Sequence, residues 1–257
     1  MADRADLAWL TRWDRQQELY IPHREARFGA MLDVLEALVG MGRLREDFTL
    51  VDLACGPAAL ATRCLERFDR ASAVGIEVDP VTLHLGAEHL SRFGGRLRLV
   101  EASITTAGWL DQLAVERVDV FALTTALHWL SPAELTALFG DLAGALPPGG
   151  VFLNGDNLGF SQALPTFTAI TSYLQNQHRT CAAHNGADDW QSWRAAARQD
   201  PVLGPLCERR DALFAASDSQ DEPPPLDLYE HALGAAGFAE VDSIWQSLDD
   251  RVLLAIR

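Results

Sequence analysis

A glycine loop and a carboxylate follow two successive predicted strands. The stretch VDLACGPAAL predicts a strand that runs into a loop and a helix, with Asp52 at the end of the strand. Ala54 and Gly56 are small enough for the backbone to come close to a ligand. Glu77, in GIEVDP, lies about 20 residues further on, the spacing at which a carboxylate accepts hydrogen bonds from both ribose hydroxyls in dinucleotide folds. The combination predicts a ligand of the adenosine type.

The same carboxylates also have a purely structural interpretation. Glu77 and Asp79 precede Pro80, and acidic residues at this place often cap the helix that follows. The sequence leaves both interpretations of Glu77 open.

The loop is a poor match for a diphosphate. The pyrophosphate of NAD normally rests on a G-x-G-x-x-G turn, whereas this loop has one glycine and carries Pro57 in the first helical turn. A ligand with adenosine at one end, an amino acid at the other and no phosphate needs fewer backbone donors.

Short β-rich runs alternate with amphipathic stretches along the first 155 residues. Five strands connected by helices predict a doubly wound, mostly parallel sheet, in which ligands bind beyond the carboxyl ends of the strands. The expected strands are residues 48–54, 72–78, 96–102, 117–124 and 149–155, and the expected helices between them are 57–68, 80–93, 107–113 and 132–146.

The two ends of the chain add elements to this sheet. Apolar residues at helical spacing predict one or two helices before Gly40. At the other end, a helix that stops at Gly237 is followed by two strands with an Asp249-Asp250 turn, which must pair antiparallel. The expectation is a seven-stranded Rossmann-like sheet with a C-terminal antiparallel hairpin, N-terminal helices and a helical insertion before strand six. The expected parts are a helical cap (1–44), an α/β core (45–159), an insertion or lid (160–225), whose closing SDSQDEPPP reads as a linker, and a closing helix and hairpin (226–257).

Composition excludes several classes of function. The net charge is −15, and no basic cluster exceeds Arg209-Arg210, so a nucleic-acid partner is not expected. All 21 basic residues are arginine, which excludes a lysine Schiff base and a Walker phosphate loop. There is no membrane-length apolar run and no signal-peptide pattern, and the four cysteines are scattered. A cytoplasmic protein with reduced thiols and no membrane partner is expected, and a homodimer is left open.

Five motifs in order resemble the class I S-adenosylmethionine-dependent methyltransferases of the small-molecule type. VDLACGPA resembles the family's D-x-G-x-G-x-G motif, with Ala54 and Ala58 in place of its outer glycines. We expect the alanines to be tolerated, because much of such a loop can use negative φ angles. GIEVDP resembles the second motif, and LRLVEASI the third, with Ser103 where the family commonly has an aspartate for the adenine amino group. VDVFALTTALHWL and LPPGG resemble the remaining two motifs, although LPPGG lacks the family's lysine, and the end of the chain resembles the family's closing hairpin.

The resemblance implies a fold, a cofactor and a set of residues around that cofactor. The cofactor is S-adenosyl-L-methionine, with Glu77 as the ribose ligand, and no metal is expected. The implied cofactor-binding residues are Asp52, Ala54, Cys55, Gly56, Glu77, Val78, Ser103, Ile104, Leu123 and Arg27.

Two residues are candidates for catalysis. His128 follows the fourth strand, where the family's methyl site lies, and is the candidate base; alternatively it only packs at a helix start. Tyr20 is the second candidate, because an N-terminal helix in this family often folds over the cofactor. Tyr20 or Arg27 could hold the methionine carboxylate, for which arginine has the planar fork.

The insertion carries two further patterns. His178, Cys181, His184 and Asp188 lie within helical reach of one another, but the spacing of an established zinc site is absent. A substrate lid is the preferred interpretation, with an apolar pocket or the lid's own core formed by Phe160, Phe167, Tyr173, Trp190 and Trp193.

These observations predict an enzyme that methylates an oxygen, nitrogen or carbon atom of a small metabolite. Two alternatives stay open. One is a protein of the same fold that binds the cofactor without transferring methyl, as a cyclase or regulator, and the other is an NAD-dependent oxidoreductase.

Overall fold

A single seven-stranded sheet organises the molecule. The computed structural model describes residues 4–184, 188–215 and 225–257. The strand order is β3-β2-β1-β4-β5-β7-β6, with the first five strands parallel and β7 antiparallel to both of its neighbours. The expected fold class is therefore confirmed. The strands are β1 (Thr49–Leu53), β2 (Ser72–Glu77), β3 (Leu97–Glu101), β4 (Val120–Thr124), β5 (Val151–Asn157), β6 (Glu240–Ser247) and β7 (Asp250–Ile256).

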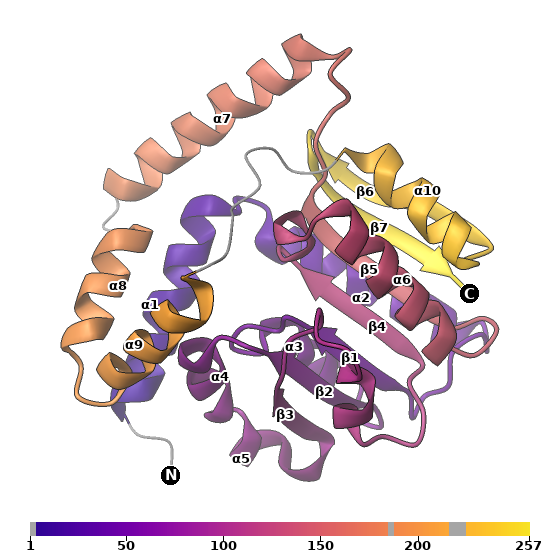
Figure 1. Ribbon diagram of the computed structural model, residues 1–257, viewed down its shortest axis with the longest axis horizontal. Helices are drawn as coiled ribbons and strands as arrows, with labels where there is room; N and C mark the ends of the chain where they lie inside the picture. Colours follow the sequence, from indigo (N-terminus) through magenta and orange to yellow (C-terminus); the bar gives the residue numbers. More distant parts are fainter. Residues whose placement is uncertain (1–3, 185–187, 216–224) are drawn as a thin grey trace.

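Helices cover both faces of the sheet and bury two apolar layers (Figure 1). One face packs against α2 (Arg24–Gly40), α3 (Ala59–Arg67) and the short α5 (Leu90–Phe93). The other face packs against η2 (Trp109–Leu113), η3 (Leu127–Trp129), α6 (Pro132–Ala145) and α10 (Leu226–Ala236). Strands buried on both sides explain the near-continuous apolar runs of the sequence.

A third, smaller core joins the insertion to the N-terminal helix. The insertion forms α7 (Pro165–His184), α8 (Trp190–Gln199) and α9 (Leu203–Phe214). Buried residues of α8 and α9 pack against α1 (Arg4–Tyr20) and α4 (Pro80–Ala87), and α7 arches from the sheet towards α8 (Figure 1). Of the predicted linker 217–225, all but Pro225 lies outside the described residues. No helix in the described ranges is long and apolar enough to cross a membrane.

Some predicted boundaries are wrong. The expected helix 80–93 is divided into α4 and α5, and the expected helix 107–113 is only the 3-10 turn η2. Gly108 and Ala114 on either side of η2 both have left-handed backbone, with φ of 77° and 44°, which stops a longer helix. Asp250 belongs to β7 rather than to the hairpin turn, because it pairs with the end of β5. Leu248, with φ of 58°, takes the turn position instead.

Candidate functional site

In the loop between β1 and α3, every second residue from Ala54 to Ala58 has left-handed backbone. The φ angles of Ala54, Gly56 and Ala58 are 48°, 54° and 63°. The expectation that the two alanines use negative φ angles is wrong. The turn requires left-handed backbone at all three motif positions, so a Cβ is carried where glycine would be relaxed.

Asp52 lies beneath this loop and holds the start of α3. Its carboxylate is buried and accepts a hydrogen bond from the backbone N–H of Ala61 at 3.0 Å, in the first turn of the helix. Ala58, at the N-cap, gives no side-chain bond, so Asp52 supplies the missing acceptor. Burial raises the pKa of Asp52 to about 7, against the smaller opposing effect of the Ala61 bond.

Glu77 ties the loop to the end of β2. Its Oε2 accepts from the backbone N–H of Gly56 at 2.8 Å, and its Oε1 accepts from those of Val78 and Asp79, both at 2.8 Å. Burial raises the pKa of Glu77, and the three N–H donors oppose that rise. An ionised carboxylate has about four acceptor positions. One position, on Oε2, is therefore left for a ligand.

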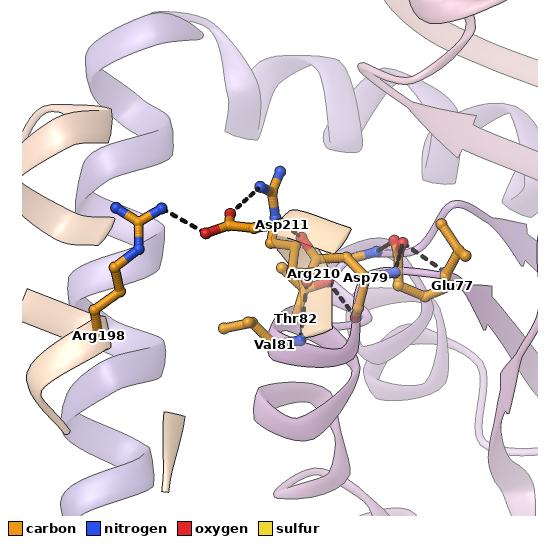
Figure 2. Close-up of polar contacts among 9 residues, drawn as sticks. Glu77, Asp79, Val81, Thr82, Arg198, Arg210 and Asp211 are labelled. Carbon is orange, nitrogen blue, oxygen red and sulfur yellow. Dashed lines mark hydrogen bonds and ion pairs between the residues drawn. The ribbon is translucent and has the colours of Figure 1, made fainter. Parts of the chain in front are cut away.

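The sequence offered Glu77 and Asp79 as caps of the helix that begins at Pro80, and in the structure Asp79 is the cap. It is the N-cap of α4 and accepts from the backbone N–H of Val81 at 2.9 Å. Its other oxygen pairs with Arg210 of α9, as Figure 2 shows beside Glu77. On the same helix, Arg209 pairs with Glu101 at the end of β3. The insertion is thus fastened to the ends of β2 and β3.

The other predicted cofactor residues differ in accessibility. Cys55 is buried, and its Sγ packs at Gly75 of β2, where a Cβ would come within 2.7 Å. Ser103 and Ile104 follow β3, half-buried, and the Ser103 hydroxyl contacts that of Thr105 at 2.8 Å. Leu123 lies fully buried in the core. Their roles towards a cofactor stay predictions.

His128 forms a pair with an aspartate that the sequence did not single out. Its Nδ1 lies 3.0 Å from Oδ1 and 3.2 Å from Oδ2 of Asp156, which is fully buried at the end of β5. A carboxylate accepts, so Nδ1–H donates and Nε2 is left with its lone pair. Burial lowers the pKa of His128, but attraction and hydrogen bonding by Asp156 outweigh it, so the net shift is upward. For Asp156, burial raises the pKa and His128 more than cancels this, so the net shift is downward.

Arg27 and Tyr20 are engaged with protein groups. The Arg27 guanidinium pairs with Asp250 of β7 and donates to the Thr125 hydroxyl at 2.7 Å and to the Gly155 carbonyl at 2.9 Å. Gly155 makes room, because a Cβ there would come within 2.5 Å of the Arg27 side chain. Tyr20 accepts through its hydroxyl from the Trp190 backbone N–H at 3.3 Å. Arg27 thus joins α2 to β5, to β7 and to the residue that follows β4, and the ligand roles of both residues stay predictions.

The residues of the metal pattern are dispersed over other partners. His178 contacts the Glu18 carbonyl at 2.8 Å, His184 contacts that of Thr180 at 2.7 Å, and Asp188 pairs with Arg12. In the part of the chain that the structure describes, no three histidine, cysteine or acidic side chains are grouped to hold a metal.

Comparison with known proteins gives a family for the core of the chain. Residues 50–150 match the family model described as "Methyltransferase domain". Two curated relatives are carboxy-S-adenosyl-L-methionine synthases. The one from Pseudomonas syringae pv. tomato is 24% identical over 82% of this chain and 76% of its own length, and the one from Colwellia psychrerythraea is 23% identical over 84% and 81%.

Several solved structures with the same fold are methyltransferases. An O-methyltransferase family protein from Burkholderia thailandensis superposes with a TM-score of 0.54 and 18% identity, covering 98% of this chain and 69% of its own. Human N-acetylserotonin methyltransferase, solved with S-adenosylmethionine, gives a TM-score of 0.51 and 16% identity over 93% and 59%. The chain spans about half the length of several others, such as an O-methyltransferase family 2 protein from Planctomyces limnophilus (TM-score 0.50, 19% identity, 81% and 49%).

Proposed function

We propose that this chain, whose core is a class I S-adenosylmethionine-dependent methyltransferase domain, methylates a small molecule at the carboxyl ends of β1, β2, β4 and β5. The cofactor would lie along the loop of Ala54 and Gly56 and reach Glu77, and the acceptor would meet His128. The whole-protein activity is a proposal, because many of the structures that match are much longer than this chain.

The residues at the ends of β1 and β2 fit an adenosyl amino acid. Glu77 has one acceptor position left after its three backbone bonds, so in this conformation it can take one ribose hydroxyl rather than both. Gly56 has open space where a Cβ would stand, which suits close approach of a ligand to the loop. Ser103 offers a hydroxyl where the family commonly has a carboxylate for the adenine.

The base would be His128, held in one tautomer by Asp156. When bound, S-adenosylmethionine supplies an electrophilic methyl group whose transfer leaves a neutral thioether, so alignment matters more than acid catalysis. A hydroxyl or amine acceptor must lose a proton, and Nε2 of His128 can take it while Nδ1–H donates to Asp156. The raised pKa of His128 makes it a stronger base that is neutral only at higher pH.

We further infer a small-molecule acceptor, a cytoplasmic location, and no nucleic-acid or membrane partner. The net charge of −15 disfavours binding of a polyanion and therefore favours a small-molecule acceptor over a nucleic acid. The division into cap, core, lid and closing hairpin is kept as part of the proposal, with residues 160–225 selecting the acceptor. A homodimer stays a prediction.

The His128–Asp156 pair is the observation that most supports this function, and the experiment therefore tests His128. Labelled S-adenosylmethionine is incubated with a small-molecule extract of the source cells, and methylated products are identified by mass spectrometry. We expect His128→Ala to lower the rate by about 10²- to 10⁴-fold. His231→Ala, at an exposed histidine of α10, is the matched control.

The pH profile gives a second readout of the same pair. The rate should rise with pH through a midpoint above about 6.5, and Asp156→Asn should move that midpoint down. Full activity in His128→Ala would leave the proposal without its base.

A second candidate is synthesis of a cofactor derivative without methyl transfer. The two curated relatives are carboxy-S-adenosyl-L-methionine synthases, and their matches extend over 82% and 84% of this chain. In that case the same mass spectrometry would find a carboxylated cofactor and no methylated acceptor.

A further inference from the structure

Arg251 is a buried cation that the proposed mechanism does not use. It lies in β7 and is 8% exposed. Its guanidinium lies over the Phe160 ring, 5.3 Å from the centroid, and within the described ranges its buried Nε has no hydrogen-bond partner. Arg27, comparably buried, has Asp250, Thr125 and Gly155 as partners. Arg27 is therefore held by protein acceptors, whereas the Nε–H of Arg251 has none.

Nearby carboxylates do not relieve this charge. Asp249 and Glu230 attract it only from beyond ion-pair distance, and burial lowers the pKa of Arg251. Asp156 is its direct partner across the β5–β7 ladder, but that carboxylate is engaged with His128. Burying the Nε–H of a guanidinium without a hydrogen-bond acceptor is unfavourable unless something else compensates. A ligand carboxylate would supply that compensation.

The surroundings of Arg251 are those expected for an acceptor. Residues directly opposite in an antiparallel pair have Cβ atoms about 5 Å apart and share a face of the sheet, so Arg251 projects on the side of Asp156 and His128. Phe160, under the guanidinium, packs edge-to-face on Phe167 of α7. A cation, two aromatic rings and the base thus gather where β5 leads into the insertion.

Resting on the proposed function, we infer that Arg251 binds a carboxylate of the molecule that meets His128, so the acceptor is a small organic acid with an apolar part that packs on Phe160. The planar guanidinium can hold a carboxylate through two parallel hydrogen bonds. Nε2 of His128 then faces the hydroxyl or amine of the same molecule.

The first test uses Arg251→Gln, with Arg43→Gln at an exposed arginine as the matched control. Each protein is incubated with labelled S-adenosylmethionine and the small-molecule extract, either untreated or with its carboxylates converted to methylamides. We expect at least tenfold less labelled product with Arg251→Gln, no change with Arg43→Gln, and loss of labelling on amidation. Equal labelling by Arg251→Gln, or undiminished labelling of the amidated extract, would overturn the assignment.

A second test needs no acceptor. Because the apolar stem of methionine can pack where the arginine stem lies, Arg251→Met should remove a buried charge whose Nε has no hydrogen-bond partner and raise the Tm of the cofactor-free protein by about 2–4 °C. An unchanged or lower Tm would mean that the arginine is structural. This result stands even if no extract is labelled, an outcome that would count against the proposed function alone.

The carboxylate could belong to the cofactor instead of the acceptor, and binding separates the two sources. If it belongs to the acceptor, Arg251→Gln should bind S-adenosylhomocysteine and carboxy-S-adenosyl-L-methionine as the unchanged protein does. If it belongs to the cofactor, only the carboxylated compound should bind at least tenfold more weakly. Both results keep Arg251 as the carboxylate-binding residue, but the second would overturn its assignment to the acceptor. Weaker binding of both compounds would contradict a carboxylate-binding role.

Discussion

The two halves of the sheet's carboxyl edge are built in different ways. In the cofactor half, at the ends of β1 and β2, backbone N–H groups hold the carboxylates of Asp52 and Glu77. In the acceptor half, at the ends of β4 and β5 and the start of β7, side chains distant in sequence hold one another, as in Arg27–Asp250 and His128–Asp156. The backbone bonds to Asp52 and Glu77 span at most 21 positions in sequence, whereas the two side-chain pairs of the acceptor half span 28 and 223.

This difference matches the tasks that we propose for the two halves. A cofactor common to a family needs a constant shape, which a loop and its backbone bonds supply. An acceptor needs charges and a base at positions that only the tertiary structure brings together.

Breaking the Arg27–Asp250 pair should weaken the acceptor half most. Arg27 is 1% exposed, so Arg27→Met leaves the Asp250 carboxylate buried without its partner, and the free energy of unfolding should fall by about 3–5 kcal/mol. Urea denaturation measures this.

The double variant Arg27→Met/Asp250→Leu should recover most of that loss, because it removes both charges. The exposed pair of Arg45 and Asp47 provides the control, and Arg45→Met should leave the unfolding midpoint almost unchanged. A double variant as unstable as Arg27→Met would show that the charge is not the cause.

Asp52 should make the cofactor half sensitive to pH. Its folded pKa of about 7 lies above the unfolded value near 3.8, so the folded state holds an extra proton, and this stabilisation is lost as the pH rises from about 4 to 7. Asp52→Asn keeps an acceptor oxygen for the Ala61 N–H without this loss. We expect the variant to match the unchanged protein at pH 4 and to exceed its free energy of unfolding by about 2–4 kcal/mol at pH 8.

Urea midpoints across this pH range are the measurement. A constant difference between the two proteins would mean that folding does not shift the pKa of Asp52.

The two loop alanines should respond differently to glycine. Left-handed backbone costs an alanine about 1–2 kcal/mol, and glycine costs about 0.5–1 kcal/mol in chain entropy, so half-buried Ala54→Gly should stabilise by about 0.5–1 kcal/mol. Ala58 is fully buried, and losing its methyl removes about 0.8 kcal/mol of packing, which makes Ala58→Gly nearly neutral.

Thermal unfolding measures both variants, and Ala37→Gly, on the exposed side of α2, is the destabilising control. Because the Ala58 methyl is buried, Ala58→Gly should leave the Kd for S-adenosylhomocysteine unchanged. Clear tightening would mean that this methyl meets the cofactor.

Much of the fold could be predicted from the sequence, because each element carries its own local signal. Periodic apolar residues marked the helices, and the strands carried continuous apolar runs. The motif around Glu77 is likewise local, and the family resemblance drawn from it is confirmed by the match over residues 50–150. Backbone angles such as φ at Ala54 and Ala58 could not be predicted, because alanine does not indicate left-handed backbone.

The acceptor half could not be predicted, because its partners meet only through strand pairing. Asp156 reaches His128 from the next strand, and Arg251 reaches the same face from the end of the chain. One signal was present: polar residues interrupt apolar strands in VFLNGDN and DRVLLAI. A charged residue inside a buried strand must find a partner, or it is held for a ligand.

The central claim is that the cofactor half and the acceptor half of the carboxyl edge have separate roles. Calorimetry of S-adenosylhomocysteine binding to the unchanged protein, Glu77→Ala and His128→Ala tests it most directly. We predict that Glu77→Ala weakens the Kd by about 10- to 150-fold, the range for a hydrogen bond to a charged group, and that His128→Ala changes it less than about twofold. Absence of binding to the unchanged protein, or an unaffected Kd in Glu77→Ala, would contradict the account.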